Sequence, residues 1–308
     1  MPSPSGWPGW PITPNMGEAQ VGSTGTRLAV LGSPIGHSKS PAIHAAAYAV
    51  LGLDWRYERF DVPEGELADF MASRGDGWRG FSVTMPLKQE ALDFASTLAP
   101  AASDIGAVNT LVFDDAGSAA PARGWNTDVT GFIAALSDAG VERASRVRLL
   151  GAGGTAAAVV AALPSLQTEQ LSIVVRAPER AQALAELASS LGVRVEVLTF
   201  AQFEAGPASS KAADLVVNTV PGDRDHLTVD EAWVQGAVLF DVLYDPWPTK
   251  LAAHWLSAGG RVVSGLELLL AQALVQVRLF TGRGESEPLP QEAEVRTAMR
   301  SAALRVSE

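Results

Sequence analysis

A lysine just after a predicted strand is the clearest sign of chemistry in this chain. The apolar run Gly80-Phe81-Ser82-Val83-Thr84-Met85 predicts a buried strand, and it stops at Pro86, two residues before Lys88. A strand that ends at a proline places its last polar groups at the edge of a sheet, where ligands commonly bind. Lys88 also opens a predicted helix, so an exposed lysine at a helix start is the simpler alternative, and other residues must decide.

Three more polar side chains favour a ligand-binding role for Lys88. Two serines follow the first predicted strand in the run Gly36-His37-Ser38-Lys39-Ser40-Pro41. Spaced i, i+2 on an extended loop, Ser38 and Ser40 offer two hydroxyls to one small polyhydroxylated ligand. Asp128, in the run Asn126-Thr127-Asp128, lies at the predicted junction between two domains. From there its carboxylate can reach a cleft that both domains line.

The elements that position these residues follow an α/β order with a mostly parallel sheet in the first half. The sequence predicts strands over 27–32, 55–62, 80–85 and 107–112 and helices over 41–51, 64–73 and 88–94. A second α/β unit begins near residue 146. Its predicted strands are 146–150, 171–175, 214–218 and 237–241, and its helices run to 163 and over 178–191. Two helices, over 265–281 and 291–306, close the chain.

A glycine-rich loop connects the first strand and helix of the second unit. Gly151-x-Gly153-x-x-Ala156 has the strand-to-helix context that the dinucleotide fingerprint requires. The first glycine permits the tight turn, the second lets backbone amides approach a pyrophosphate, and a small third residue permits close packing of the helix on the strand. The helix N-terminus then faces the phosphates. The loop therefore predicts a dinucleotide site.

The end of the next strand indicates which dinucleotide binds. An acidic residue there would bind the ribose hydroxyls of NAD, whereas an arginine accommodates the 2′-phosphate of NADP. Here the strand ends in Val174-Val175-Arg176, and Arg180 follows one helical turn later. Two guanidinium groups near one phosphate favour NADP. Arginines on a solvated helix start are the alternative interpretation.

The composition excludes several other classes of function. A net charge of −11 argues against nucleic-acid and anionic-membrane partners, and the hydrophobic content of 47% is ample for folded cores. The chain has no cysteine, and no pair among its four histidines has metal-ligand spacing, so we expect no metal site. No apolar run reaches the roughly 18 residues needed to span a bilayer. We expect a cytoplasmic protein, monomeric or homodimeric.

Taken together, these motifs resemble the shikimate dehydrogenase family. They occur in the family's order and cover essentially residues 27 to 282. The matching runs are Ser33-Pro34-Ile35-Gly36-His37-Ser38-Lys39-Ser40-Pro41, Val83-Thr84-Met85-Pro86-Leu87-Lys88, Ala107-Val108-Asn109-Thr110, Asn126-Thr127-Asp128, Gly151-Ala152-Gly153-Gly154, Asp241-Val242-Leu243-Tyr244, and Gly265-Leu266 with Ala271-Gln272.

The resemblance implies reversible reduction of 3-dehydroshikimate to shikimate with NADPH, a step in aromatic amino-acid biosynthesis. Lys88 and Asp128 would be the acid–base pair. The implied substrate-binding residues are Ser38, Ser40, Thr84, Asn109, Tyr244 and Gln272. The implied cofactor-binding residues are Gly151, Ala152, Gly153, Gly154, Thr155, Arg176, Arg180 and Gly265.

The family also implies a two-domain α/β fold. We expect a flexible extension over 1–26, a substrate-binding and catalytic domain over 27–127, a Rossmann-type NADP-binding domain over 128–264, and helices over 265–308 that return to the first domain.

Two positions depart from the family pattern. Ser82 stands where the family often has an asparagine, which reaches further toward a ligand, and Val175-Arg176-Ala177 stands where the family often has Asn-Arg-Thr. Two alternative functions remain open. One is an NAD-dependent quinate/shikimate dehydrogenase, against which Arg176 argues. The other is a non-catalytic nucleotide-binding module of the same fold, which would not need both Lys88 and Asp128.

Overall fold

The computed structural model describes residues 25–114, 121–205, 212–222 and 231–305. The chain divides into two compact units. The first unit runs up to Thr127 and resumes at Ala273, and the second unit is Asp128–Gln272. The expected N-terminal extension lies outside the described residues, except for Gly25 and Thr26. The division of substrate and cofactor binding between the units stays a prediction.

The first unit contains a six-stranded sheet in the order β2-β1-β3-β5-β6-β4. It is mostly parallel, as predicted, because β5 alone runs against its neighbours β3 and β6. The strands are β1 (Arg27–Gly32), β2 (Arg56–Asp61), β3 (Trp78–Val83), β4 (Thr97–Leu98), β5 (Thr110–Phe113) and β6 (Ala122–Trp125). The strands β4 and β6 were not predicted.

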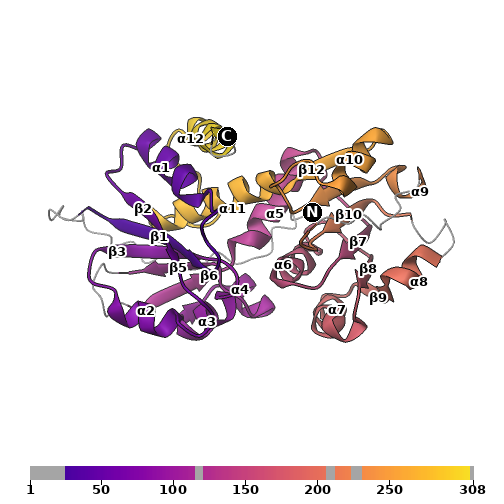
Figure 1. Ribbon diagram of the computed structural model, residues 1–308, viewed down its shortest axis with the longest axis horizontal. Helices are drawn as coiled ribbons and strands as arrows, with labels where there is room; N and C mark the ends of the chain where they lie inside the picture. The colour runs from indigo at the N-terminus through magenta and orange to yellow at the C-terminus, as the bar shows by residue number, and fades with distance from the viewer. Residues whose placement is uncertain (1–24, 115–120, 206–211, 223–230, 306–308) are drawn as a thin grey trace, which may run out of the picture. The chain divides into compact units, whose positions relative to one another are not determined.

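Helices cover both faces of this sheet. Figure 1 shows α1 and α12 on one face and α2 and α3 on the other. Their bounds are α1 (Ser40–Val50), α2 (Leu67–Ser73), α3 (Lys88–Phe94), α4 (Pro100–Ile105) and α12 (Glu292–Arg305). Under α2 and α3 the core is largely aromatic. Phe81 is fully buried and packs edge-on against Phe70 and Phe113, an arrangement that aromatic rings prefer.

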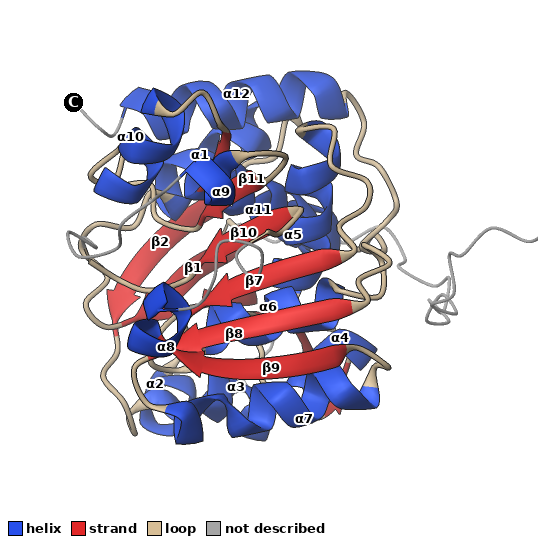
Figure 2. Cartoon of the chain, turned by 90° about the vertical axis from the view of Figure 1, so that its right-hand side faces the viewer, coloured by secondary structure: helices blue, strands red, loops and turns tan. Residues whose placement is uncertain are grey.

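The second unit contains six strands that all run parallel, in the order β12-β11-β10-β7-β8-β9. Figure 2 shows the middle of this sheet as a row of parallel arrows. From β7 the sheet continues to β8 and β9 on one side and to β10, β11 and β12 on the other, so the strand order reverses between β7 and β10. Ligands of such sheets bind at this switch point. The strands are β7 (Arg146–Leu150), β8 (Gln170–Val175), β9 (Arg194–Thr199), β10 (Leu215–Asn218), β11 (Val238–Asp241) and β12 (Arg261–Ser264).

The remaining helices belong wholly or partly to the second unit. They are α5 (Thr127–Asp138), α6 (Gly154–Ala162), η1 (Pro178–Ala181), α7 (Gln182–Ser190), α8 (Phe200–Ala205), α9 (Glu231–Val234), α10 (Lys250–Ser257) and α11 (Gly265–Phe280). The chain returns to the first unit within α11, between Gln272 and Ala273. The predicted return of the C-terminal helices to the first domain is confirmed. No helix among the described residues is long and apolar enough to cross a membrane.

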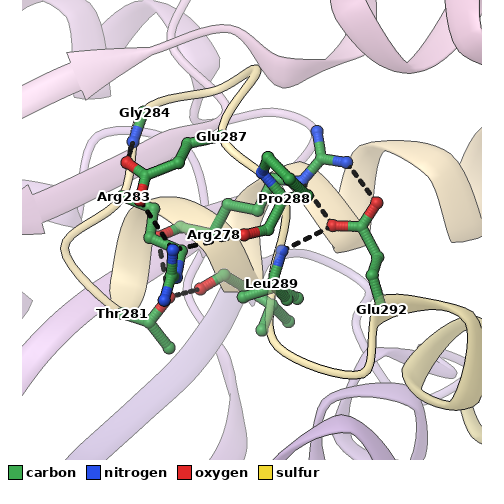
Figure 3. A network of polar contacts seen from close by, with 9 residues as sticks. Arg278, Thr281, Arg283, Gly284, Glu287, Pro288, Leu289 and Glu292 are labelled. Carbon is green, nitrogen blue, oxygen red and sulfur yellow. Dashed lines mark hydrogen bonds and ion pairs between the residues drawn. The ribbon is translucent and has the colours of Figure 1, made fainter.

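An ion pair connects the last two helices of the first unit (Figure 3). Arg278 on α11 binds both carboxylate oxygens of Glu292 on α12, at 3.0 and 2.6 Å. Its third nitrogen donates to the backbone oxygen of Glu285, at 2.6 Å. Burial alone would raise the pKa of Glu292, but the hydrogen bonds from Arg278 and from the Leu289 amide outweigh it and lower the pKa. This bidentate pair fixes the start of α12 against α11.

A second carboxylate in the same loop behaves in the opposite way. Burial raises the pKa of Glu285 to about 7, and its buried Oε1 has no hydrogen-bond partner among the described residues. Arg278 binds the backbone of Glu285 and leaves its carboxylate uncompensated. The charged form of Glu285 is therefore a source of instability in the folded protein.

Replacing Glu285 with glutamine should stabilise the protein at alkaline pH and change little at acidic pH. The folded-state pKa lies above the unfolded value of about 4.3, so the folded protein binds more protons and loses stability as the pH rises from about 4.5 to 7. We expect Glu285→Gln to add about 1–2 kcal/mol at pH 8, or roughly 3–6 °C in the thermal midpoint. Thermal unfolding at pH 5 and pH 8 measures the difference.

The control variant is Glu287→Gln, which changes an exposed carboxylate of the same loop. Its effect should be small and nearly the same at both pH values. An equal midpoint shift for Glu285→Gln at pH 5 and pH 8 would show that its carboxylate does not titrate in this window.

Candidate active site

The carboxyl ends of β1 and β3 lie side by side and bring two of the predicted motifs together. The amide of Thr84 donates to the oxygen of Leu31, at 2.9 Å, and the amide of Ser33 donates to the oxygen of Met85, at 3.0 Å. A Cβ at Gly32 would lie 2.5 Å from the Thr84 methyl group and 2.8 Å from the Met85 oxygen. This junction therefore requires a glycine. It places the serine loop (residues 33–40) beside the lysine segment (residues 84–88).

The end of β2 holds the first half of the serine loop. The Asp61 carboxylate accepts hydrogen bonds from the Ser33 hydroxyl, at 2.7 Å, and from the Ile35 amide, at 3.2 Å. Two residues earlier on the same strand, Arg59 donates to the oxygen of Gly36, at 2.8 Å. Sequence reasoning did not identify these two charged residues, because they act on a loop more than 20 residues away.

The second half of the serine loop is held by two buried groups. Lys39 is 4% exposed, and its ammonium donates to the oxygen of Ala303 in the last turn of α12, at 3.3 Å. The Nδ1 of His44 lies 3.0 Å from the oxygen of Ser40. Burial lowers the pKa of His44 to about 4, so the ring is neutral at pH 7 and Nδ1 donates this bond. Ser38 and Ser40, which are linked by a 3.3 Å bond, are thus held in place.

Lys88 and Asn109 occupy neighbouring positions at the same edge of the sheet. Lys88 is the first residue of α3 and is half-buried, and its backbone oxygen accepts from the amide of Val108, at 3.0 Å. The oxygen of Asn109 accepts from the amide of Val83, at 2.7 Å. The structure therefore brings the serine loop, the lysine segment and Asn109 to one edge of the sheet. These segments carry the five predicted residues of the first unit, namely Ser38, Ser40, Thr84, Lys88 and Asn109.

The side chain of Asn109 fixes the start of α5. Its Oδ1 accepts from the amide of Thr127, at 2.9 Å, and its Nδ2 donates to the Thr127 hydroxyl, at 3.1 Å. Asp128 is the next residue in the chain and lies in the first turn of α5, 8% exposed. Asn109 is itself only 2% exposed. A structural contribution of Asn109 thus accompanies the predicted contact with substrate.

Two other predicted substrate residues, Gln272 and Tyr244, lie in the second unit. Gln272 is 9% exposed and donates to the oxygen of Leu269, at 2.8 Å. A Cβ at Gly131 on α5 would lie 2.8 Å from the backbone nitrogen of Gln272, so this glycine lets α5 and α11 meet at Gln272. Asp128 lies three residues before Gly131, on the same side of α5. Sequence reasoning missed Gly131, although its spacing from Asp128 was a usable signal.

Tyr244 follows a buried aspartate that the sequence reasoning did not explain. The carboxylate of Asp241 accepts from the amide of Asn218, at 3.0 Å, from the hydroxyl of Thr249, at 2.6 Å, and from the backbone of Leu243, at 3.2 Å. These bonds fix the loop after β11 from both sides. Burial, and then the charge of Asp245, raises the pKa of Tyr244. Tyr244 is therefore a neutral hydrogen-bond donor at pH 7.

The glycine loop lies at the switch point of the second sheet and fits a dinucleotide. Gly151 follows β7 with φ of +104°, and a Cβ there would lie 2.6 Å from the Thr219 hydroxyl after β10. By contrast, a Cβ at Gly153 would meet no atom within 4 Å. Gly153 caps α6 without a side-chain hydrogen bond. The first amides of α6 therefore face open space that a pyrophosphate can approach.

The other predicted cofactor residues lie in two places. Ala152, Gly154 and Thr155 belong to the glycine loop and the start of α6. Arg176 directly follows β8, the neighbour of β7, and Arg180 lies in η1, with both side chains exposed. Gly265 is packed against the backbone of Val242, where a side chain would clash. Among the described residues no group of three or more His, Cys, Asp or Glu is placed to bind a metal ion.

Comparisons with known proteins agree on one family. The profile of the shikimate dehydrogenase substrate binding domain matches residues 30–111. The shikimate dehydrogenase (NADP(+)) of Moorella thermoacetica is 38% identical over 272 residues, which cover 86% of this chain and 90% of that protein.

Solved structures give the same result. The shikimate dehydrogenase of Mycobacterium tuberculosis superposes with a TM-score of 0.76 at 38% identity, over 91% of this chain and 99% of that chain. The shikimate 5-dehydrogenase of Thermus thermophilus, in complex with NADP(H) and shikimate, gives a TM-score of 0.74 at 32% identity, over 90% and 99%. Both similarities extend over nearly the full length of the two chains.

The two loop glycines should differ sharply when each is changed to alanine. Gly151→Ala should lower the thermal midpoint, because a positive φ costs an L-residue about 1–2 kcal/mol and the new methyl group meets Thr219. Gly153→Ala should keep the wild-type midpoint and weaken NADPH binding by about tenfold, since its methyl group would lie where the backbone approaches the pyrophosphate. Thermal unfolding and fluorescence titration measure the two effects. Wild-type NADPH affinity in Gly153→Ala would place the dinucleotide elsewhere.

Proposed function

The chain belongs to the shikimate dehydrogenase family, and on this basis we propose that it is an NADP-dependent shikimate dehydrogenase, which reversibly reduces 3-dehydroshikimate to shikimate. One observation carries this function. The first unit brings the serine loop, the lysine segment and Asn109 to one edge of its sheet. A sheet edge with two serines, a threonine, an amide and one ammonium suits a small polyhydroxylated acid better than an apolar ligand.

Lys88 and Asp128 form the acid–base pair of the proposed reaction. Reduction of a ketone builds negative charge on the carbonyl oxygen, and the Lys88 ammonium stabilises this charge and donates the proton. In this assignment Asp128 assists the proton transfer of Lys88. In the direction of oxidation, neutral Lys88 accepts the proton of the substrate hydroxyl. NADPH, when bound, supplies the hydride.

The substrate-binding residues contribute orientation. We assign this contribution to the hydroxyls of Ser38, Ser40, Thr84 and Tyr244 and to the amides of Asn109 and Gln272. Ser38 is half-buried and the held serine loop presents its hydroxyl in one place. Such pre-ordering lowers the entropy that binding must remove.

NADP is the cofactor that the second unit fits. The amides at the start of α6 and Gly153 bind the pyrophosphate, and Arg176 and Arg180 bind the 2′-phosphate. An enzyme specific for NAD would need an acidic residue where Arg176 follows β8. A cytoplasmic location and a monomeric or homodimeric state stay predictions from the sequence.

The function is tested by steady-state oxidation of shikimate and of quinate with NADP⁺ and with NAD⁺. We expect the wild-type protein to prefer shikimate and NADP⁺.

Lys88→Met should lower kcat by at least ~10²-fold, because it removes the general acid, while the thermal midpoint and the NADPH affinity stay near wild type. The matched control is Lys250→Met, which changes an exposed lysine of α10. Near-native turnover of Lys88→Met would refute its role, and a preference for quinate with NAD⁺ would refute the function.

Arg176→Ala should reduce the preference for NADPH over NADH by about one to two decades. A charge-assisted bond of this type contributes ~1.5–3 kcal/mol, and only NADPH carries the 2′-phosphate. The KM for NADPH should therefore rise while the KM for NADH stays within about twofold. Arg194→Ala is the control, because Arg194 is an exposed residue at the start of the neighbouring strand β9. Equal losses for both cofactors would mean that Arg176 supports the loop without binding the phosphate.

A further inference from the structure

A chain of buried hydrogen bonds crosses the first unit and ends at Asn109, one of the predicted substrate-binding residues. The Tyr57 hydroxyl on β2 donates to the Ser82 hydroxyl on β3, at 2.6 Å, and Ser82 donates to Oε1 of Gln276 on α11, at 2.8 Å. The Nε2 of Gln276 then donates to the Thr110 hydroxyl, at 3.0 Å, and to the Asn109 oxygen, at 3.4 Å. These residues are almost inaccessible to solvent, with Gln276 2% exposed.

The chain of bonds continues to the residue before Asp128. The Thr110 hydroxyl donates to Oδ1 of Asn109, at 2.7 Å, and the same oxygen accepts from the amide of Thr127, at 2.9 Å. Nδ2 of Asn109 donates to the Thr127 hydroxyl, at 3.1 Å. Four strands and helices that are distant in sequence are therefore joined to the start of α5.

The direction of the bonds follows from the first donor, the Tyr57 hydroxyl, which donates to Ser82. The Tyr57 ring stacks on His44 with centroids 4.0 Å apart, and burial raises the pKa of the hydroxyl. Ser82 has one hydroxyl proton. Because its oxygen accepts a hydrogen bond from Tyr57, its own O–H group donates a hydrogen bond to Gln276. The Gln276 oxygen therefore faces Ser82, and its NH₂ group must face Asn109 and Thr110.

The same reasoning sets the orientation of Asn109. The Thr110 hydroxyl accepts a hydrogen bond from Gln276, so its O–H group donates to Oδ1 of Asn109. The Nδ2 group of Asn109 then points toward the Thr127 hydroxyl. A buried hydrogen-bond network favours one arrangement of its side chains, because a reversed amide would set donor against donor and acceptor against acceptor. The side chain of Gln276 connects the first hydrogen-bond donor of this network, Tyr57, to the last acceptor, Asn109.

We propose that Gln276 is a positioning residue for the reaction, which rests on the function proposed above. Gln276 orients the amide of Asn109, Asn109 holds Thr127, and the backbone after Thr127 carries the acid–base residue Asp128. Gln276 touches neither substrate nor cofactor in this assignment. It acts through the bonds that it makes to β3 and β5.

The test compares Gln276→Met with Arg278→Met in the full-length protein. Both changes remove side-chain hydrogen bonds of α11, but those of Arg278 go to the backbone of Glu285 and to Glu292 on α12, outside the chain of bonds. We expect Gln276→Met to lower kcat for shikimate oxidation by ~10-fold, the scale of a modest misplacement of an acid–base group, with the KM for NADP⁺ within about twofold. Arg278→Met should lower the thermal midpoint and keep kcat. Equal kcat values for the two variants would overturn the proposal.

A double mutant gives the decisive readout. If Gln276 acts through Asp128, Gln276→Met should change kcat by no more than about twofold in the background of Asp128→Asn. Multiplicative losses would overturn the proposal, because they would show that Gln276 acts independently of Asp128. Wild-type oxidation of shikimate, measured first, separates these outcomes from a failure of the proposed function.

Tyr57→Phe keeps the test valid if Gln276→Met does not fold. It removes only the first donor, so Ser82 and the Gln276 amide become free to reverse. We expect a loss in kcat of about threefold that likewise vanishes in the Asp128→Asn background. A wild-type kcat in a folded Tyr57→Phe variant would contradict the fixed direction of the chain of bonds.

Discussion

The close approach of β1 and β3 at Gly32 is the constraint on which the site of the first unit depends. Because Gly32 has no side chain, the backbone oxygens of Leu31 and Met85 can accept hydrogen bonds from the amides of Thr84 and Ser33. The serine loop then starts beside the lysine segment, and the bond between Lys88 and Val108 adds the start of β5. A larger residue would separate two motifs whose chemistry is useful only when they lie together. Catalytic positioning thus begins with backbone packing rather than with the reactive groups.

Charged groups then hold the loops that this packing brings together. Lys39 lies at the N-cap of α1, where a positive charge opposes the helix dipole and no acidic residue follows in the first turn. The same ammonium lies at the carbonyl end of α12, where a positive charge is favourable. Arg278 holds the opposite end of α12 through Glu292. The position of Lys39 is therefore explained by α12, which ties the serine loop to the C-terminal helix.

Sequence reasoning identified the strongly periodic elements and the motif residues but not the contacts between distant residues. The buried strands β1, β3 and β8 were predicted, since each is a mostly apolar segment. The strand β6 was missed because Arg123 and Gly124 interrupt any apolar pattern, and β9 because it is a half-buried edge strand. Asp241 positions the loop before Tyr244 through Asn218 and Thr249, which only the fold brings near, so the spacing of residue types carried no sign of its role. Gly131 was missed although it lies three residues after Asp128.

The departure at Ser82 acquires a physical explanation in the structure. An asparagine, the family's frequent residue here, offers both a donor and an acceptor at the end of its side chain. A serine is too short to offer both at a distance, but Ser82 accepts a hydrogen bond from Tyr57 and donates one to Gln276. The pair of Tyr57 and Ser82 thereby presents a directed donor to Gln276 on α11. The hydroxyl proton of Ser82 is engaged inside the first unit, so Ser82 supports the fold of this unit through Gln276.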